Sequence, residues 1–379
     1  MSIIIGGDTV PTKTNQQLFN NGDAYELCGT GILDAFNEAD YRILNLEVPL
    51  CADSSPIKKC GPCLIADPSS TEALKALKVD LLTLANNHIM DQGRNGLIST
   101  TAALDKAGIS YVGVGENPEK ASQPFFFTTN GKKFGVYACA EHEFSIAEGN
   151  KPGANPFDPL DTPDHVIQTK AQCDYLIVLY HGGKEHYRYP SPYLQKTCRK
   201  LVEKGADLVV CQHSHCVGCK EEYKNGTIVY GQGNFLFDGQ DNEYWNTGLL
   251  IRIDNMQQTE YIPIEKNGCR TRLATGRTKE EILKGFFTRS EEINNPETIN
   301  DRYLSFAEEN YTNYVMHFSG CEGSLAFRAA DKLFNHRLKE KHIKRYTDRY
   351  GPAVLNFVEC EAHRELLLKA LKIKIQDDI

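Results

Sequence analysis

The sequence contains Thr83-Leu84-Ala85-Asn86-Asn87-His88-Ile89-Met90-Asp91-Gln92-Gly93, in which a run of polar side chains directly follows an apolar segment. That apolar segment, Val79 to Leu84, is typical of a buried strand in a parallel sheet. After the polar run, apolar residues recur at helical spacing as far as Gly108, and glycine is favoured just past a helix end. A strand that ends in amide, imidazole and carboxylate groups before a helix is typical of the ligand-binding edge of an α/β sheet.

The composition is that of a globular protein. The chain has 379 residues, which allows one large domain with a smaller appendage, or two domains. No apolar segment approaches the roughly 18 residues needed to cross a bilayer, so no membrane span is predicted. The N-terminus has neither a basic region nor a cleavable apolar region, which predicts a cytoplasmic protein. Thirteen cysteines, an odd number in a large chain, predict free thiols in a reducing compartment.

Charge is distributed unevenly along the chain. The formal net charge is −8, and residues 266–379 carry 20 basic and 17 acidic side chains, which leaves −11 for residues 1–265. An acidic N-terminal part argues against nucleic acid as a bulk partner. The negative charge of this part is better suited to binding divalent cations.

Strand and helix patterns alternate along the first half of the chain, and shorter strand-like runs follow. This order predicts an α/β core with some antiparallel edge. Three local signals support it: a capping box at Ser69-Ser70-Thr71-Glu72, a tight hairpin turn at Asn130-Gly131 and a helix start at Ser191-Pro192. The expected strands are 2–5, 42–46, 79–84, 110–114, 125–128, 134–140, 175–180, 207–211, 227–230, 248–253 and 260–264.

The pattern changes near Gly268. Strand signals end there, and apolar residues with helical spacing appear around 329–338 and 355–373. We therefore predict a catalytic domain over residues 1–267 and an α-helical region over residues 268–379.

The ends of several expected strands carry groups that bind metals. Carboxylate oxygens, amide oxygens and imidazole nitrogens together suit one or two transition-type divalent ions such as Mn, Fe or Zn. Two ions about 3.5–4 Å apart activate water and stabilise an in-line displacement at phosphorus. Taken singly, each residue also has a structural interpretation, such as a hydrogen-bonded histidine or a strand-end cap. The residues are Asp8, Asn45, Glu47, Asn87, His88, Asp91, His181, Glu185, His213 and His215.

These residues lie in short blocks whose order along residues 3–238 resembles that of the CapA-type capsule or poly-γ-glutamate synthesis family. That family is itself similar to the calcineurin-like metallophosphoesterases. The blocks are Gly7-Asp8; Asn45-Leu46-Glu47-Val48-Pro49-Leu50; Ala85-Asn86-Asn87-His88 with Asp91 and Gly93; His181-Gly182 with Glu185; His213-Ser214-His215; and Tyr230-Gly231-Gln232-Gly233-Asn234-Phe235.

The resemblance implies an α/β fold, a four-layer α-β-β-α metallophosphoesterase-like sandwich with a C-terminal α-helical appendage. It also implies a set of metal ligands. Asp8 and His215 would bind one ion, and Glu47 would bridge. The ligands implied for the other ion are Asn87, His181 and His213.

The resemblance further implies a general acid, His88. Asp91 or Glu185 would orient His88 or another histidine of the site. The chain departs from the phosphoesterases at the first block, which reads Asp8-Thr9-Val10 instead of Asp-x-His. One ligand of the first ion is therefore absent, and occupancy by one ion or by two both remain open.

The leading hypothesis is a metal-dependent phosphoester hydrolase associated with capsule polysaccharide or poly-γ-glutamate biosynthesis. Metal-activated water would attack phosphorus, with His88 as general acid. The substrate would be a small-molecule or polymer-linked phosphoester. Two alternatives are a non-hydrolytic biosynthetic or scaffolding component of capsule assembly and a glutamyl amide-bond enzyme.

Two cysteine pairs flank the expected site. Cys60 and Cys63 lie in a long loop, and Cys216 and Cys219 directly follow His215. A loop is not the strand-to-helix turn that a redox Cys-x-x-Cys motif requires. If the two loops meet, the four thiols would form a structural zinc site; the alternative is unligated thiols.

Overall fold

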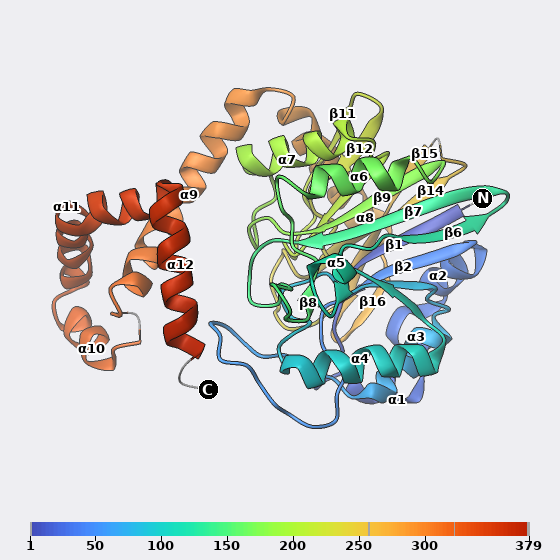
Figure 1. The fold of residues 1–379 in the computed structure, drawn as a ribbon, viewed down its shortest axis with the longest axis horizontal. Coiled ribbons are helices and arrows are strands. Elements are labelled where there is room, and N and C mark those ends of the chain that lie inside the picture. The colour runs from blue at the N-terminus through green and yellow to red at the C-terminus, as the bar shows by residue number, and fades with distance from the viewer. Residues whose placement is uncertain (1, 257, 322, 377–379) are drawn as a thin grey trace. The chain divides into compact units, whose positions relative to one another are not determined.

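The computed structural model describes residues 2–256, 258–321 and 323–376. The chain forms two compact units, Met1–Asn300 and Asp301–Ile379. The first unit contains two large sheets that face each other and the helices that cover them (Figure 1).

The first sheet has eight strands in the order β16-β15-β14-β1-β2-β3-β4, and β13 also pairs with β1. Strands β1, β2, β3 and β4 are mutually parallel, whereas β14 runs antiparallel to β1. The strands are β1 (Ser2–Thr9), β2 (Tyr41–Leu46), β3 (Leu81–Thr83), β4 (Ser110–Val112), β13 (Asn234–Leu236), β14 (Thr247–Asp254), β15 (Gln258–Asn267) and β16 (Arg270–Leu273).

The second sheet has six strands in the order β11-β12-β10-β9-β7-β6. Its four central strands are parallel. The predicted hairpin turn is confirmed, because Asn130 and Gly131 join β6 to β7 with φ values of 49° and 74°. The strands are β6 (Phe125–Thr129), β7 (Lys132–Ala140), β9 (Tyr175–His181), β10 (Leu208–Gln212), β11 (Lys220–Tyr223) and β12 (Gly226–Val229); a separate pair consists of β5 (Val114–Gly115) and β8 (Gly153–Ala154).

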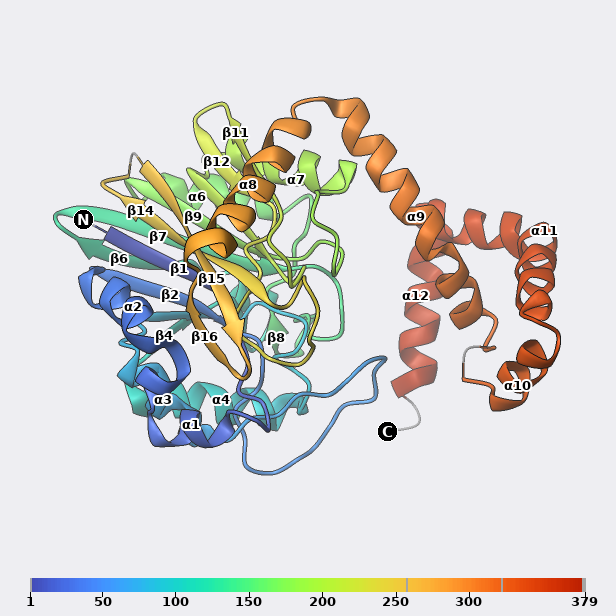
Figure 2. The same ribbon diagram turned by 180° about the vertical axis from the view of Figure 1, so that it is seen from behind.

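Helices cover the outer faces of both sheets (Figures 1 and 2). Helices α6 and α7 bury Val166, Cys198 and Leu201 against the six-stranded sheet. Helix α2 packs on the other sheet, where Phe36 stacks on Phe235. This arrangement confirms the predicted four-layer α-β-β-α sandwich. The helices are α1 (Gln16–Asn21), α2 (Ala24–Glu38), η1 (Pro68–Ser70), α3 (Thr71–Ala76), α4 (Gly93–Ala107), α5 (Pro118–Ala121), α6 (Thr162–Lys170), α7 (Pro192–Glu203) and α8 (Gly276–Glu292).

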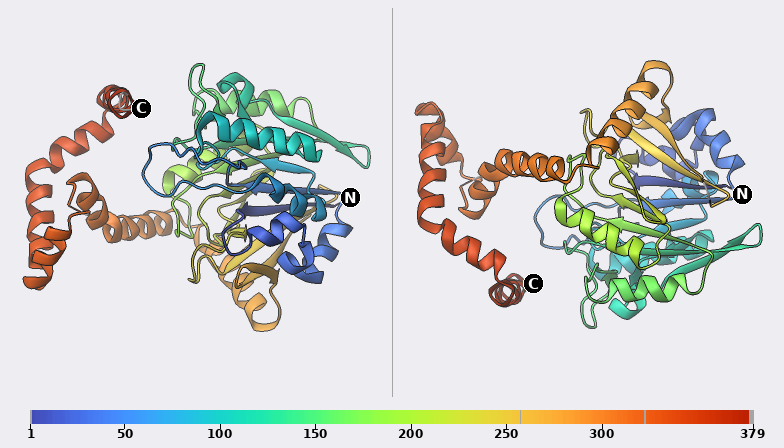
Figure 3. Two further views of the ribbon diagram at one scale, coloured as in Figure 1. Left: turned by 90° about the horizontal axis from the view of Figure 1, so that it is seen from below. Right: turned by 90° about the horizontal axis from the view of Figure 1, so that it is seen from above.

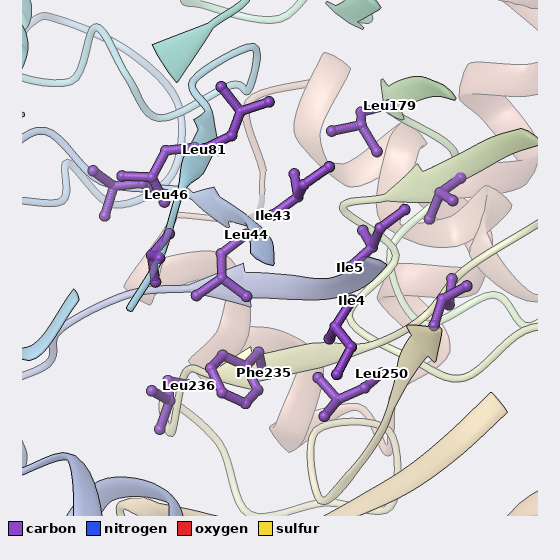
Figure 4. Packing of buried hydrophobic residues seen from close by; sticks show 14 of the residues in the cluster. Ile4, Ile5, Ile43, Leu44, Leu46, Leu81, Leu179, Phe235, Leu236 and Leu250 are labelled. Carbon is purple, nitrogen blue, oxygen red and sulfur yellow. The ribbon is translucent and has the colours of Figure 1, made fainter. Parts of the chain in front are cut away.

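The central strands are apolar on both faces because both faces are covered. Ile4 and Ile5 of β1 are adjacent in sequence and are both fully buried. Since successive side chains of a strand point to opposite faces, one packs between the sheets and the other packs beneath the helices. Figure 4 shows these two residues among the buried side chains that include Ile43 and Leu179.

The structure confirms two of the predicted helix ends and corrects one. Ser191 caps α7 by accepting a hydrogen bond from the Leu194 amide at 3.0 Å, and Gly108 ends α4 in the left-handed conformation. The predicted capping box at 69–72 is wrong. There Asp67 accepts the amide of Ser69 at 2.8 Å and starts the short helix η1 instead.

The first unit continues past residue 267, where the sequence predicted the domain to end. Strand β16 pairs with β15, and α8 then packs on the same sheet. Phe286 of α8 is fully buried, and its ring lies 4.8 Å from that of Tyr261 in β15. Helix α8 is mostly polar, so its narrow apolar face gave little signal in the sequence.

Phe286→Ala is therefore expected to destabilise the first unit by about 3 kcal/mol, because it removes a large buried side chain. The chain has a single tryptophan, Trp245, so urea unfolding followed by its fluorescence reports on this unit. Phe287→Ala is the matched control, since Phe287 is 41% exposed. Equal losses of stability in the two variants would contradict the assignment of α8 to this core.

All elements of the second unit are helices, drawn in orange to red in Figure 3. Val315 and Met316 are buried, and Asp331 accepts the backbone amide of Lys339 at 2.8 Å. Among the described residues, no helix is both long enough and apolar enough to span a membrane. The helices are α9 (Pro296–Phe318), which begins at the end of the first unit, α10 (Leu325–Leu333), α11 (Arg337–Glu359) and α12 (Glu361–Gln376).

Candidate metal centre

The parallel strands of the two sheets bring their carboxyl ends to one region. Asp8 of β1 is in register with Asn45 of β2, and His181 of β9 is in register with Gln212 of β10. Glu47 directly follows β2. Because these strands are central to their sheets, the side chains at their ends are almost fully buried.

Two groups of side chains are spaced to hold cations, and they share Glu47. One consists of Glu47, His181 and His213, and the other of Asp8, Glu47 and His215; within each group the ligand atoms all lie within 4.8 Å of one another. Ions bound at about 2.0–2.2 Å place opposed ligands about twice that distance apart. The structure therefore brings together five of the six residues that the sequence predicted as ligands.

Asn87, the sixth predicted ligand, lies beside the first group. Its Oδ1 atom is 3.1 Å from Nε2 of His181. Its Nδ2 atom donates to Glu143 at 2.8 Å, and its backbone carbonyl accepts the Ser145 hydroxyl at 2.6 Å. These contacts, both from the loop after β7, direct the amide oxygen toward the ligand atoms.

Asp8 and His215 in the second group are also held by neighbours. Asn45 donates to Asp8 Oδ1 at 2.7 Å, and the backbone amide of His213 donates to Asp8 Oδ2 at 3.3 Å. Nδ1 of His215 donates to Asn234 Oδ1 at 2.8 Å, so Nε2 is the nitrogen that would bind a cation after the ring loses a proton. Trp245 packs against the same imidazole, with ring centroids 4.7 Å apart.

The backbone at this edge is in uncommon conformations. His213 and His215 have φ values of 87° and 53°, in the left-handed region that side chains other than glycine seldom adopt. Gly7 is required by close packing, since a Cβ atom there would lie 2.0 Å from the carbonyl oxygen of Gly233. Strained backbone of this kind gathers at functional sites.

Asp8 and His215 form a charged pair. Burial alone would raise the pKa of Asp8, but the hydrogen bond and the charge of His215 outweigh it and lower this pKa to about 2. Burial alone would lower the pKa of His215, but Asp8 and Glu47 raise it to about 9.

Glu47 and the remaining two histidines favour their neutral forms. Burial, together with the charge of Asp8, raises the pKa of Glu47 to about 8. Burial lowers the pKa of His181 to about 4, and burial with two neighbouring histidines holds the pKa of His213 well below its usual value. Neutral imidazoles bind metals, so both rings are in the form that a cation needs.

A divalent cation fits this set of side chains. Neither carboxylate oxygen of Glu47 accepts a hydrogen bond from any described residue, and Nδ1 of His213 also has no hydrogen-bond partner among them. His181 Nε2 is 3.3 Å from one of those oxygens. A fully buried carboxylate with no donor is costly in free energy, and a cation between Glu47 and the two groups would remove that cost.

His88 contacts the carboxylate of Asp91. Its Nδ1 atom is 2.6 Å from Asp91 Oδ2. Its neighbour in the sequence, Asn87, lies beside the ligand atoms, so His88 stands at the edge of the site. Within the described part of the chain, the carboxylate that contacts His88 is that of Asp91 and not that of Glu185.

Glu185 interacts instead with the charges of His213 and His215. Partial burial alone would raise its pKa, but the charges of His213 and His215 outweigh burial and lower this pKa below its usual value. Its position therefore favours Asp91, of the two carboxylates predicted from the sequence, as the partner of His88.

The structure does not assemble the zinc site considered for the two cysteine pairs. Among the described residues, the groups with metal-ligand spacing contain no cysteine. Cys216 and Cys219 are buried, whereas Cys60 is exposed, and all thirteen cysteines are free thiols. Cys219 belongs to the buried apolar cluster on the six-stranded sheet, so its burial needs no metal.

Several residues outside the two groups of ligands hold the site together. Asn45 was already a candidate ligand because it lies at the end of its strand, whereas Asn234, at the start of the short strand β13, gave no strand signal. Glu143, which orients Asn87, and Lys59, whose Nζ atom is 3.2 Å from His88 Nδ1, lie in loops without periodicity. No pattern in the sequence pointed to these two.

Comparison with known proteins places these residues within a recognised family. The family model described as "Bacterial capsule synthesis protein PGA_cap" matches residues 2–239. The chain is 31% identical over 209 residues to "Capsule biosynthesis protein CapA" of Bacillus anthracis, which covers 53% of this chain and 51% of that protein.

A second relative is "Probable polyglutamine synthesis accessory protein Rv0574c" of Mycobacterium tuberculosis, 30% identical over 212 residues, or 52% of this chain and 56% of that protein. The chain thus spans about half the length of the curated relatives it matches. Among solved structures, a novel phosphatase from Mycoplasma pneumoniae is similar at a TM-score of 0.45 and 16% identity, covering 71% of this chain and 94% of that one.

Proposed function

Because the chain belongs to the bacterial capsule synthesis protein family PGA_cap, we propose that it is a metal-dependent phosphoester hydrolase that acts in capsule polysaccharide or poly-γ-glutamate biosynthesis. The substrate is a small-molecule or polymer-linked phosphoester. The names of the relatives support the biosynthetic setting, and the arrangement of side chains supports the chemistry.

One observation carries the proposal: Glu47 is shared by two groups of potential ligands, and both of its carboxylate oxygens lack a hydrogen bond from any described residue. A buried carboxylate without hydrogen-bond donors destabilises the fold, whereas the same carboxylate is a suitable ligand for a pair of cations. Asp8 and His215 would hold one cation, and Asn87, His181 and His213 the other. When bound there, the cations would supply positive charge at the phosphoryl oxygens and would lower the pKa of a water molecule.

The chain's own groups account for the remaining steps. His88 donates Nδ1–H to Asp91, which leaves its Nε2 atom to carry the proton for the departing oxygen. The buried surroundings keep bulk water from screening these charges. The thirteen free thiols support the cytoplasm as the compartment.

The test is hydrolysis of bis(p-nitrophenyl) phosphate by the full chain with Mn²⁺, before and after removal of metal by a chelator. We expect turnover that depends on added Mn²⁺. His88→Ala should keep the metal and lose about 10²–10⁴-fold in kcat, whereas His215→Ala should lose activity together with one of the two bound ions. Bound metal without turnover on a panel of mono- and diesters would favour the non-hydrolytic scaffold. Turnover of a γ-glutamyl amide instead would favour the amide-bond enzyme.

A further inference from the structure

The long segment between β2 and η1, residues 51–67, folds around the residues that follow His88. It is drawn in blue and extends from the body of the first unit in Figures 1 and 2. Both backbone and side-chain contacts fix it. Ile57 donates its amide to the carbonyl of Asp91 at 3.0 Å, Leu64 donates its amide to Asp91 Oδ2 at 2.6 Å, and Ser55 donates its amide to Gln92 Oε1 at 2.6 Å.

This segment places a lysine beside the proposed general acid. The side chain of Lys59 is only 1% exposed and forms an ion pair with Oδ1 of Asp91, whose side chain is fully buried. The same Nζ atom is 3.2 Å from His88 Nδ1 and lies 5.0 Å from the centroid of the Phe144 ring. Asp91 is thus contacted by Lys59 on one carboxylate oxygen and by His88 on the other.

Lys59 does not bind the cations, and its contacts instead fix the orientation of the Asp91 carboxylate. The two groups with metal-ligand spacing do not contain Asp91, and the ammonium of Lys59 has no lone pair with which to bind a cation. A carboxylate held by one oxygen rotates, whereas a carboxylate held by both oxygens has a fixed plane. Lysine can only donate, so Nζ and Nδ1, 3.2 Å apart, both direct their protons to the Asp91 carboxylate and not to each other. With that plane fixed, Asp91 Oδ2 accepts the Nδ1–H of His88, and the ring keeps Nε2 for the substrate.

We propose that Lys59 is a positioning residue for phosphoester cleavage, which acts through Asp91 to hold His88 in the tautomer and orientation that a general acid needs. The proposal rests on the function proposed above for His88. It adds that residues 51–67 are part of the catalytic architecture and not only a connection between β2 and α3.

The kinetic test compares substrates that differ in leaving group, since a general acid matters most when the leaving oxygen is basic. Phenyl and 2,4-dinitrophenyl phosphodiesters are hydrolysed by the full chain with Mn²⁺. Lys59→Met should lower kcat for the phenyl ester by about 10–100-fold, with a much smaller loss for the dinitrophenyl ester and an unchanged KM. Lys59→Arg should recover most of the loss, and Lys58→Met, which changes the exposed neighbour, is the matched control. Equal losses on both esters would overturn the proposal.

A second readout does not require turnover. Long-range ¹H–¹⁵N spectra of the metal-free full chain with labelled histidine report the tautomer of His88, whose signals are assigned by their absence in His88→Ala. We expect one tautomer with the proton on Nδ1 in the wild type and in Lys58→Met. In Lys59→Met the two nitrogen shifts should move toward each other, while those of His215 stay in place.

These two readouts separate the possible failures. If the wild type hydrolyses no ester but the His88 nitrogen shifts respond to Lys59→Met, the function proposed above fails and the positioning by Lys59 stands. If those shifts are unchanged in Lys59→Met, the role of Lys59 is refuted whatever the activity. The Trp245 unfolding transition verifies folding, and Lys59→Gln replaces Lys59→Met if that transition is lost.

Discussion

Glu47→Gln is expected to remove both cations and to lower Mn²⁺-dependent hydrolysis by about 10³-fold or more. Glu47 is the side chain common to the two groups of ligands, so its loss affects both. Charge stabilisation by bound metal contributes several kcal/mol, and each 1.4 kcal/mol corresponds to a factor of ten in rate. Glutamine keeps the size of the side chain but is a weak, neutral ligand, so the effect is one of charge and not of packing.

The same substitution is expected to stabilise the metal-free protein. Burial and Asp8 raise the pKa of Glu47 to about 8, so at pH 9 the wild type must hold an ionised, unpartnered carboxylate in its interior. Removing such a group recovers about 1–3 kcal/mol. Urea unfolding of the metal-free proteins at pH 9, followed by Trp245 fluorescence, measures the difference.

With added Mn²⁺, the wild type should become more stable than Glu47→Gln. A ligand that binds the folded state at 100 times its Kd stabilises that state by about 2.7 kcal/mol, and this gain is available to the wild type alone. Glu222→Gln is the matched control, because Glu222 is an exposed glutamate in β11 whose side chain pairs with Lys220. Full metal content in Glu47→Gln would contradict the shared position of Glu47.

The positions of the ligands followed from the sequence because each lies at the end of a strand. Asn87, His181 and His213 each follow an apolar run, and parallel strands bring such ends to one edge. The strand patterns did not show that two sheets would face each other. That arrangement was implied by the family resemblance of the blocks. The cation ligands were therefore predictable as a set from their strand ends, whereas their division into two groups that share Glu47 came from the family resemblance.

Residues that reach the site from irregular segments were not predictable in this way. Lys59 is held beside His88 because Ile57 and Leu64 of the same loop form hydrogen bonds with Asp91. Such contacts leave no periodic pattern in the sequence. Asn234 reaches His215 through β13, which is too short to give a strand signal. The extent of the first unit was missed for a related reason, since few side chains of α8 are apolar and buried.

Substituting His213 and His215 separately distinguishes two cations from one. Glycine is the suitable replacement, because both residues have positive φ values and glycine adopts these without strain. The two side chains belong to different groups, so each variant should keep about one bound ion per chain where the wild type keeps two. Each should also lose about 10²-fold or more in activity, because a single ion stabilises less of the developing charge.

The two single-ion variants should differ in affinity. The group that survives in His215→Gly has Asn87 Oδ1 beside it, 3.1 Å from His181 Nε2, as a further oxygen ligand. The group that survives in His213→Gly consists of Asp8, Glu47 and His215, at the position where the sequence lacks the histidine of Asp-x-His. Metal analysis after dialysis at limiting Mn²⁺ should therefore find the ion in His215→Gly and little in His213→Gly. Loss of all metal in both variants would mean that the imidazoles serve one shared ion, and Glu47 would then be a ligand of that ion and not a bridge.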